Sequence, residues 1–553
     1  KTVLQLFHPR VLITLRTPLA GRMAKKCRGR VLPRTTRTDI LLSCRPAKIL
    51  HATVLVLYRY FHITSNQQLS FHPLETWHRH HHHHHQQQSR QRVRADCKFI
   101  IMHIGLIVPP FHGHLNPGVT LGGKLKARGN QVTLFAPLIG NIYAERENIG
   151  FYELAAGEDD KESQAEIELM AAQSGLEAFK STMSTIAKCV QVILRDMPDA
   201  IDEMKVDALL VDEVLYWGGA TVAEIKNIPF GTVANAMNIM HSTDGPPFLT
   251  TWQYSGSSLY RLRDSIAWYL LSWLPSSPRL AANAWREQQG LPLIPPGTLR
   301  NGGHIQLAQQ PAFFEFPKSD NVLPKHFFYT TPWHRLDRDV DIPFPFERLN
   351  PSKKLIYASL GTVQNSLLHV YHNICKACLD MEDVQLVIAL GKEGATINIP
   401  ESELPSECII VGFCPQMNVL RKASLVITHC GMNTCLETLA CGLPAVAIPV
   451  TNDQPGVAAR WQSLGAVKVV SHVNYATASR IREYIDEILP DLSPYREAAK
   501  VLQTRLEKEA PTLDEAAALV EIAFSSQNPL TRDDPRVREV MGTKQVEPPL
   551  QVD

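Results

Sequence analysis

One stretch of the sequence, residues 424–459, constrains the fold more than any other. Its start, Ser424 to Thr428, is short, apolar and β-branched enough for a buried strand. A small-residue turn follows, then helical spacing over residues 433–440, and then a second apolar strand over residues 445–449. A strand, turn, helix and strand in this order form half of a nucleotide-binding α/β unit, in which the helix N-terminus favours an anion.

The polar residues of this stretch resemble the donor-binding signature of UDP-glycosyltransferases. In that family, the first part of the signature holds the diphosphate and ribose, and a later Asp-Gln pair holds the sugar. The matching residues here are His429, Gly431, Asn433, Thr434, Glu437, Asp453 and Gln454. The segment 453–460, DQPGVAAR, looks most like the corresponding segment of bacterial carotenoid glucosyltransferases and their cyanobacterial relatives.

A second α/β unit begins just after Met102. An apolar strand over residues 104–108 precedes a loop over 109–117, a helix over 118–128 and a strand over 131–136. This order predicts a parallel sheet with its site at the carboxyl ends of the strands. The loop is not a glycine-rich phosphate loop; it presents histidines instead.

The same family resemblance identifies a candidate catalytic pair. The segment 113–117, GHLNP, is similar to the loop that carries the catalytic histidine of these transferases, which implies His114 as the base, with His112 as the alternative. An aspartate after the strand over 206–211 orients that histidine in the family. Asp212 takes this position, and its neighbour Glu213 is the rival assignment.

The resemblance extends to the start of the second nucleotide-binding unit. After the strand over 354–359, Gly361 and Thr362 resemble the phosphate-side loop of the family. Further on, Phe413 and Gln416 occupy the positions that stack on the uracil ring and approach the ribose.

The fold class implied is α/β of the GT-B type, with two facing Rossmann-like domains and a cleft between them. We predict an acceptor-binding domain over 102–330 and a linker over 331–352. A UDP-sugar-binding domain over 353–525 follows, with a C-terminal helix that crosses back onto the first domain. Residues 526–553 read as a disordered tail.

Residues 1–101 differ from the rest in charge. They hold 18 Lys and Arg but only 3 Asp and Glu, about +15, whereas the remainder is about −13. They include six consecutive histidines, His80 to His85. We interpret the segment as a disordered or non-native extension. A metal-binding or nucleic-acid-binding arm and an organelle-targeting segment are the alternatives.

The cysteine content and the apolar runs of the sequence indicate the compartment in which the protein folds. The eleven cysteines have no secreted-framework spacing, and the C-x-x-C at Cys375 and Cys378 falls in a helix-like run, so core packing in a reduced cytoplasmic compartment is predicted. No apolar run reaches the length of a membrane span.

The acceptor is indicated by the region of residues 240–300. It is rich in aromatic and leucine side chains, which suggests an apolar acceptor or peripheral contact with a membrane. These residues are Trp252, Tyr254, Tyr260, Trp268, Tyr269, Leu270, Leu271, Trp273 and Trp285.

The function implied is inverting transfer of a hexose, by resemblance glucose, from a UDP-sugar to an apolar hydroxyl compound such as a carotenoid. No metal or other cofactor is expected, because a helix N-terminus can stabilise the leaving UDP. Met432 and Thr451 stand where plant relatives have tryptophans, so the sugar is less constrained than the UDP. A sugar-nucleotide epimerase, and transfer to a macrolide, flavonoid or sterol, are the alternatives.

Overall fold

The computed structural model describes residues 4–8, 11–15, 101–157, 168–238, 244–272, 276–296, 298, 302–318, 323–334, 342–542 and 544. The chain divides into two compact units, residues 1–94 and 95–553. In the first unit, β1 (Leu4–His8) and β2 (Val11–Leu15) pair in antiparallel fashion. The apolar and β-branched residues of these strands favour pairing, and the interpretation of residues 1–101 as a disordered or non-native extension stays a prediction. The histidine run lies outside the described residues.

The second unit begins with a seven-stranded parallel sheet, in the order β5-β4-β3-β6-β7-β8-β9. Its strands are short and mostly buried, as expected for a parallel sheet covered on both faces. They are β3 (His103–Ile107), β4 (Gln131–Ala136), β5 (Gly150–Glu153), β6 (Ala208–Asp212), β7 (Phe230–Ala234), β8 (Gln306–Ala308) and β9 (Phe327–Tyr329). We call this sheet and its helices the acceptor half.

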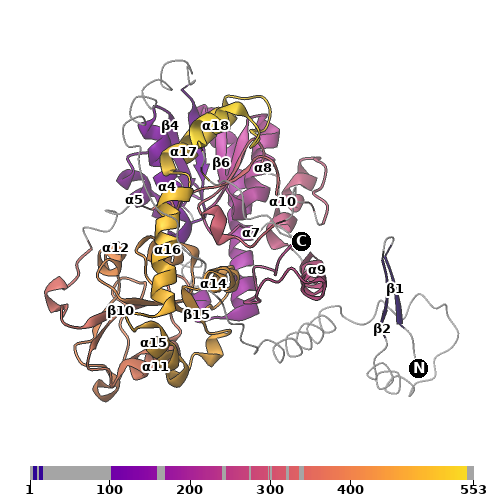
Figure 1. The fold of residues 1–553 in the computed structure, drawn as a ribbon. Coiled ribbons are helices and arrows are strands. Elements are labelled where there is room, and N and C mark those ends of the chain that lie inside the picture. Colours follow the sequence, from indigo (N-terminus) through magenta and orange to yellow (C-terminus); the bar gives the residue numbers. More distant parts are fainter. Residues whose placement is uncertain are drawn as a thin grey trace. The chain divides into compact units, whose positions relative to one another are not determined.

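Helices cover both faces of this sheet (Figure 1). They are α4 (His112–Ala127), α5 (Asn141–Arg146), α7 (Gly175–Met204) and α8 (Tyr216–Lys226). Helix α10 (Ser277–Gln288) packs on α7 and α8, and α9 (Ser258–Ser272) precedes it in the sequence. The long helix α7 is amphipathic and buries Ile186, Val190 and Leu194 against the sheet.

The helix α4 begins earlier than the sequence predicts. The pattern indicates a loop up to Pro117 and a helix from Gly118, but α4 starts at His112 and contains Pro117. Proline has no N–H to donate to the carbonyl four residues earlier, which is that of Gly113. That carbonyl accepts a hydrogen bond from Asn433 instead, so the first turn persists despite the proline.

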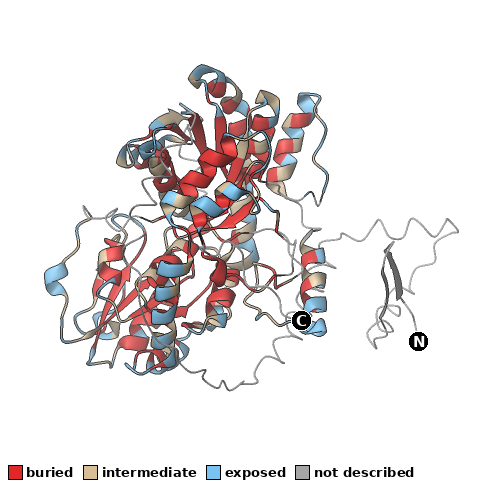
Figure 2. Ribbon diagram, turned by 45° about the horizontal axis from the view of Figure 1, so that its top comes forward, coloured by how far each residue is buried: buried red, intermediate tan, exposed pale blue. Residues whose placement is uncertain are grey.

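The second half of this unit is a six-stranded parallel sheet, in the order β12-β11-β10-β13-β14-β15. The strands are β10 (Lys354–Ser359), β11 (Val384–Ala389), β12 (Ile409–Val411), β13 (Leu425–Thr428), β14 (Ala445–Ala447) and β15 (Val467–Val469). Its helices are α11 (Leu368–Cys378), α12 (Gln416–Leu420), α13 (Met432–Ala440), α14 (Gln454–Ser463), α15 (Ala478–Ile488) and α16 (Pro494–Glu509). We call this the donor half. Figure 2 shows the buried residues concentrated in the two sheets and on the helix faces against them.

Two sequence features of the donor half fall as predicted. The strand, turn, helix and strand around residue 430 are β13, α13 and β14. Cys375 and Cys378 both lie on α11, on the side that is buried in the core. The α/β fold of two parallel-sheet domains is therefore confirmed.

The end of the chain packs on the acceptor half (Figure 1). The helix α17 (Leu513–Phe524) lies against α4, where Glu521 accepts hydrogen bonds from Arg128 at 2.8 Å and from Asn130 at 2.8 Å. The prediction of a disordered tail from residue 526 is wrong for residues 526–541. Leu530 and the helix α18 (Pro535–Met541) bury apolar side chains in the core of the acceptor half, which the polar composition of this segment concealed.

Candidate active site

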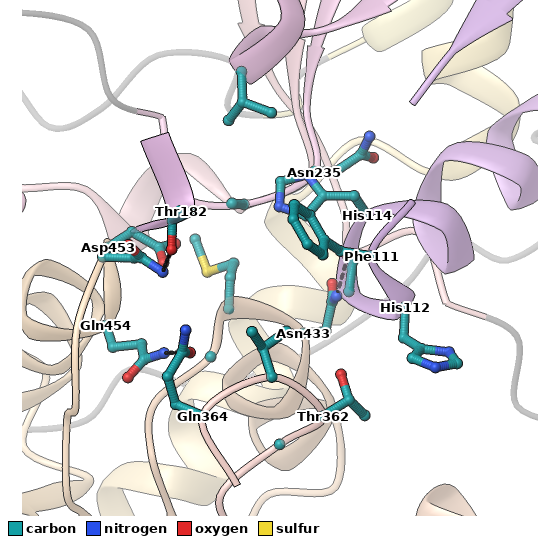
Figure 3. A pocket seen from close by; sticks show the side chains of 18 of the residues that line it. Phe111, His112, His114, Thr182, Asn235, Thr362, Gln364, Asn433, Asp453 and Gln454 are labelled. Carbon is teal, nitrogen blue, oxygen red and sulfur yellow. Dashed lines mark hydrogen bonds between the residues drawn. The ribbon is translucent and has the colours of Figure 1, made fainter. Parts of the chain in front are cut away.

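A cavity of about 1430 Å³ lies at the carboxyl ends of the two sheets (Figure 3). Its wall includes residues that directly follow strands of both halves, such as Asn235 after β7 and His429 after β13. Ligands of open α/β sheets bind at this edge. Of the residues singled out from the sequence, the wall contains His114, Gly361, Thr362, Phe413, Gln416, His429, Gly431, Asn433, Thr434, Asp453 and Gln454.

His114 lies in the cavity wall of the acceptor half and forms a hydrogen-bonded pair with Asp212, which is buried behind it. The Nδ1 atom of His114 is 2.8 Å from Oδ2 of Asp212. Two further donors hold the carboxylate: Asn235 Nδ2 at 2.7 Å from Oδ2, and the Val214 N–H at 3.0 Å from Oδ1. Because Asp212 is only 1% exposed, its three donors fix both the position of the carboxylate and the histidine ring that it faces.

The surroundings of His114 favour its protonated form. Burial alone lowers the pKa of this imidazole, but the charge and hydrogen bond of Asp212, with the charge of Asp453, outweigh burial and raise it above its ordinary value. A carboxylate at Nδ1 also fixes the neutral tautomer, with the proton on Nδ1 and a free electron pair on Nε2. The pair is therefore built to take a proton at Nε2.

The two rival residues are placed differently. His112 is hydrogen-bonded to Tyr143 and lies edge-on to Phe413, with the ring centroids 6.0 Å apart. Figure 3 shows it apart from His114 and Asn235. Glu213 is 2% exposed, but it is the carboxylate of Asp212 that lies 2.8 Å from His114 Nδ1. The geometry favours His114 and Asp212 over both alternatives.

On the donor half, the wall is the N-terminus of α13. Gly431 caps this helix, and a Cβ atom there would approach His429 Nε2 to 2.5 Å. Gly361, in a left-handed conformation at φ +80°, faces the same ring equally closely. Only glycines fit on both sides of the imidazole, so the backbone can approach a ligand at this point.

His429 is neutral at this site. Burial lowers its pKa to about 4. It can therefore offer a hydrogen bond to an anion but no positive charge at neutral pH. The attraction for an anion comes from the backbone N–H groups and the dipole of α13.

The predicted nucleoside residues lie at one end of the cavity. Phe413 and Gln416 belong to the wall, and Gln416 Oε1 accepts a hydrogen bond from Tyr357 at 2.8 Å. Glu437 is fully buried behind them and does not reach the wall, although its carboxylate is 2.5 Å from Gln416 Nε2. Gln416 therefore lies where a ligand could touch it, and the predicted contact of Glu437 with the ribose stays a prediction.

The predicted sugar residues lie where the two halves meet. Asp453 Oδ2 accepts the Met237 N–H of the acceptor half at 2.9 Å. Gln454 uses its Oε1 atom to accept the N–H groups of Val450 and Thr451, at 2.8 and 3.1 Å. Both side chains remain in the cavity wall, so contact with a sugar between the halves is possible.

The other end of the cavity is apolar. It is lined mainly by large side chains of α7, α9 and their neighbours: Met170, Phe179, Met183, Ile186, Trp217, Phe248, Trp268 and Tyr269. The sequence pattern did not indicate that α7 lines the cavity, because the acidic segment before this helix is typical of a solvent-exposed surface.

Of the aromatic and leucine residues singled out from the sequence over 240–300, Trp268, Tyr269 and Leu271 line the cavity. Trp252 and Tyr260 instead stack against Arg263, with its guanidinium 4.6 and 4.7 Å from the ring centroids. Tyr254 stacks on Phe316, and Trp285 packs near the core of α7 and α8. Trp273 lies outside the described residues.

Comparison with known proteins fits this geometry. Residues 361–513 match the glycosyltransferase family 28 C-terminal domain. The fold is similar to the crystal structure of the kitacinnamycin glycosyltransferase, with a TM-score of 0.59 and 24% identity over 76% of this chain and 99% of that one. The two facing domains and their shared cleft are those of the GT-B fold.

Sequence relatives give a narrower placement. The chain is 26% identical over 430 residues to the zeaxanthin glucosyltransferase of Pantoea ananas, covering 77% of this chain and 97% of that protein. It is 27% identical to that of Pseudescherichia vulneris, covering 76% and 98%. These similarities support a hexosyltransferase and confirm the resemblance of the chain to UDP-glycosyltransferases, and to carotenoid glucosyltransferases in particular.

Proposed function

We propose that this enzyme transfers glucose from UDP-glucose to a hydroxyl group of an apolar small molecule, with inversion at the anomeric carbon. The observation that carries the proposal is the His114–Asp212 pair, 2.8 Å apart, at a cavity whose wall also contains an anion-favouring helix N-terminus and a group of large apolar side chains. A base in one cavity with those two features has the components that glycosyl transfer to a lipophilic alcohol requires.

The acceptor hydroxyl must lose a proton as it attacks. His114 accepts it at Nε2, and Asp212 stabilises the imidazolium that forms, because the carboxylate is buried and held by Asn235 and Val214. Attack from the face opposite the nucleotide breaks the bond between the anomeric carbon and UDP. The charge that develops on the diphosphate is met by the N–H groups of Gly431 to Thr434 at the start of α13.

Catalysis without a metal is part of the proposal. Among the residues that the structure describes, no three His, Cys, Asp or Glu side chains gather as a metal site. The helix N-terminus supplies stabilisation that a cation would otherwise provide. Full activity in the presence of a chelator would support this, and a strict requirement for a divalent cation would overturn it.

For the acceptor, we propose a carotenoid alcohol. Supporting this are the apolar wall between α7 and α9 and the similarity to two zeaxanthin glucosyltransferases over almost their whole length. The test is a mass-spectrometric screen of UDP-glucose with hydroxylated lipids, zeaxanthin included, beside macrolides, flavonoids and sterols. A glucosylated xanthophyll supports the proposal, whereas products only from compact polyphenols contradict it. Conversion of the UDP-sugar without any acceptor product would favour an epimerase.

A lipophilic acceptor also implies contact with a membrane surface, which we propose occurs at α9. No helix in the described part of the chain is long and apolar enough to cross a bilayer. One face of α9, however, exposes Leu259, Leu262, Ile266 and Tyr269, and Tyr269 also belongs to the cavity wall. The stripe therefore leads into the acceptor end of the cavity.

The charge of this helix agrees with such contact. Arg261 is exposed on α9, whereas the ion pair of Arg263 and Asp264 is buried. An apolar stripe with an exposed cation suits an anionic bilayer. We expect co-sedimentation with vesicles containing anionic lipid, reduced severalfold by Leu262→Glu with Ile266→Glu. Unchanged sedimentation of that variant would contradict the assignment of α9.

A further inference from the structure

Both polar atoms of the Asn433 side chain, in the first turn of α13, form hydrogen bonds with residues of the acceptor half. Its Nδ2 atom donates to the carbonyl oxygen of Gly113 at 2.5 Å, and its Oδ1 atom accepts from Gln309 Nε2 at 2.8 Å. Because a carbonyl oxygen can only accept, the amide has one orientation. The family resemblance implies a donor-binding role for this residue, but both of its polar atoms contact the acceptor half.

The contact with Gly113 exists because of Pro117. Within a helix, the Gly113 carbonyl would accept the N–H of residue 117, which proline lacks. Asn433 takes that place. Gly113 directly precedes His114, so the amide of Asn433 holds the backbone that carries the catalytic imidazole.

The hydrogen bond between Asn433 and Gln309 belongs to a second series of contacts that ends at His114. Gln309 Nε2 also donates to the backbone carbonyl of Asn235, and Gln309 Oε1 accepts the Trp333 N–H at 3.3 Å. Asn235 in turn donates from Nδ2 to Asp212 Oδ2, the atom that faces His114. Gln309 and Asn235 are each 1% exposed, so water competes little for these bonds.

We propose that Asn433, Gln309 and Asn235 are positioning residues that set His114 and Asp212 for proton transfer, with Asn433 joining them from the donor half. We call these three residues the relay, and their role rests on the function proposed above. The base reaches its working geometry when the two halves meet, because one amide of the donor half completes the ring of hydrogen bonds. In Figure 3, Asn433 lies on the donor side, below His114 and Asn235.

The relay predicts a defect in turnover and not in nucleotide binding. A small displacement of a catalytic group lowers the rate by as much as about a hundredfold. We therefore expect Asn433→Ala and Gln309→Leu to lower kcat by roughly ten- to a hundredfold. The KM for UDP-glucose and the Kd for UDP, by calorimetry, should change less than about threefold.

Gln309→Leu is the sharper variant, since Gln309 does not belong to the cavity wall and cannot touch the donor. Its neighbour offers a matched control. Gln310 is also 1% exposed, but neither its Oε1 nor its Nε2 atom has a hydrogen-bond partner among the described residues. Gln310→Leu therefore makes the same change of side chain at the same burial without touching the relay, and it should keep kcat within about twofold.

The experiment compares these three variants with His114→Ala by steady-state kinetics, UDP calorimetry and thermal unfolding. A loss of kcat in Asn433→Ala and Gln309→Leu, with UDP affinity retained and Gln310→Leu unaffected, supports the relay. A raised Kd for UDP in Asn433→Ala, with full kcat in Gln309→Leu, overturns it and makes Asn433 a donor ligand. If His114→Ala keeps the wild-type kcat, the assignment of the base is wrong. If His114→Ala loses turnover but Gln309→Leu keeps the wild-type kcat, the base stands and the relay is wrong.

Discussion

Replacing Asp212 by Asn should nearly abolish turnover while leaving the shape of the site intact. Asp212 accepts three hydrogen bonds, so no orientation of an amide can satisfy His114, Asn235 and Val214 together. His114 can keep a bond to the new amide group by moving its proton to Nε2. The electron pair needed for proton abstraction is then lost.

The size of the effect follows from the geometry. The imidazolium of the transition state faces the carboxylate through a 2.8 Å contact, which places the charge centres roughly 4 Å apart. At the effective dielectric constant of such sites, this attraction is about 4 kcal/mol. Each 1.36 kcal/mol is tenfold in rate, so kcat should fall about a thousandfold.

The assay is kcat and KM for UDP-glucose, with kcat/KM followed from about pH 5 to pH 9. In the wild type, kcat/KM should rise through a pKa above the ordinary histidine value, because the neutral form is the base. In Asp212→Asn, the main raising influence is gone and burial remains, so the residual activity should rise at lower pH. Glu213→Gln is the control, since it removes a buried carboxylate next in sequence, and it should stay within a few-fold. Retention of more than a tenth of kcat by Asp212→Asn would refute this reasoning.

Three further outcomes are expected. The pKa of His429 is about 4, so this side chain should not titrate above about pH 6. The affinity for UDP, measured by calorimetry, should therefore depend on pH in the same way in the wild type and in His429→Gln. A histidine titration seen only in the wild type would contradict this. Deleting residues 527–553 removes the buried side chains of Leu530, Val537 and Met541, and should lower the free energy of unfolding in urea by roughly 3–6 kcal/mol. Deleting 545–553, which keeps the ion pair of Lys544 with Glu515, should leave the midpoint unchanged, and equal midpoints for the two deletions would contradict the packing of α18. Deleting residues 1–101 should preserve both folding and glucosyl transfer, and loss of both would show that the basic segment is needed.

Much of the site was predictable because parallel sheets place polar residues after buried strands at one edge. His114 and Asp212 are 98 residues apart in sequence, yet each lies near the carboxyl end of a strand, and the structure brings them to 2.8 Å. The turn between β13 and α13 was predictable for the same reason. Local pattern and family resemblance agreed at these positions.

The features of the site that could not be predicted from the sequence depend on tertiary contacts. Asn235 follows β7 and could have been singled out by its position, but Gln309 acquires its role only through Asn433, 124 residues away. Glu437 matches the family pattern, yet it is buried behind Gln416. The early start of α4 likewise depends on a hydrogen bond from the other half, so no local reading of Pro117 could predict it.

The anomeric configuration of the product tests the central claim most directly. UDP-glucose is α-linked, so a single displacement assisted by His114 gives a β-glucoside. We predict that the wild type forms a β-glucoside of a xanthophyll, identified by the anomeric proton coupling in its NMR spectrum, and that His114→Ala forms none. An α-glucoside, or equal product from His114→Ala, would contradict the account.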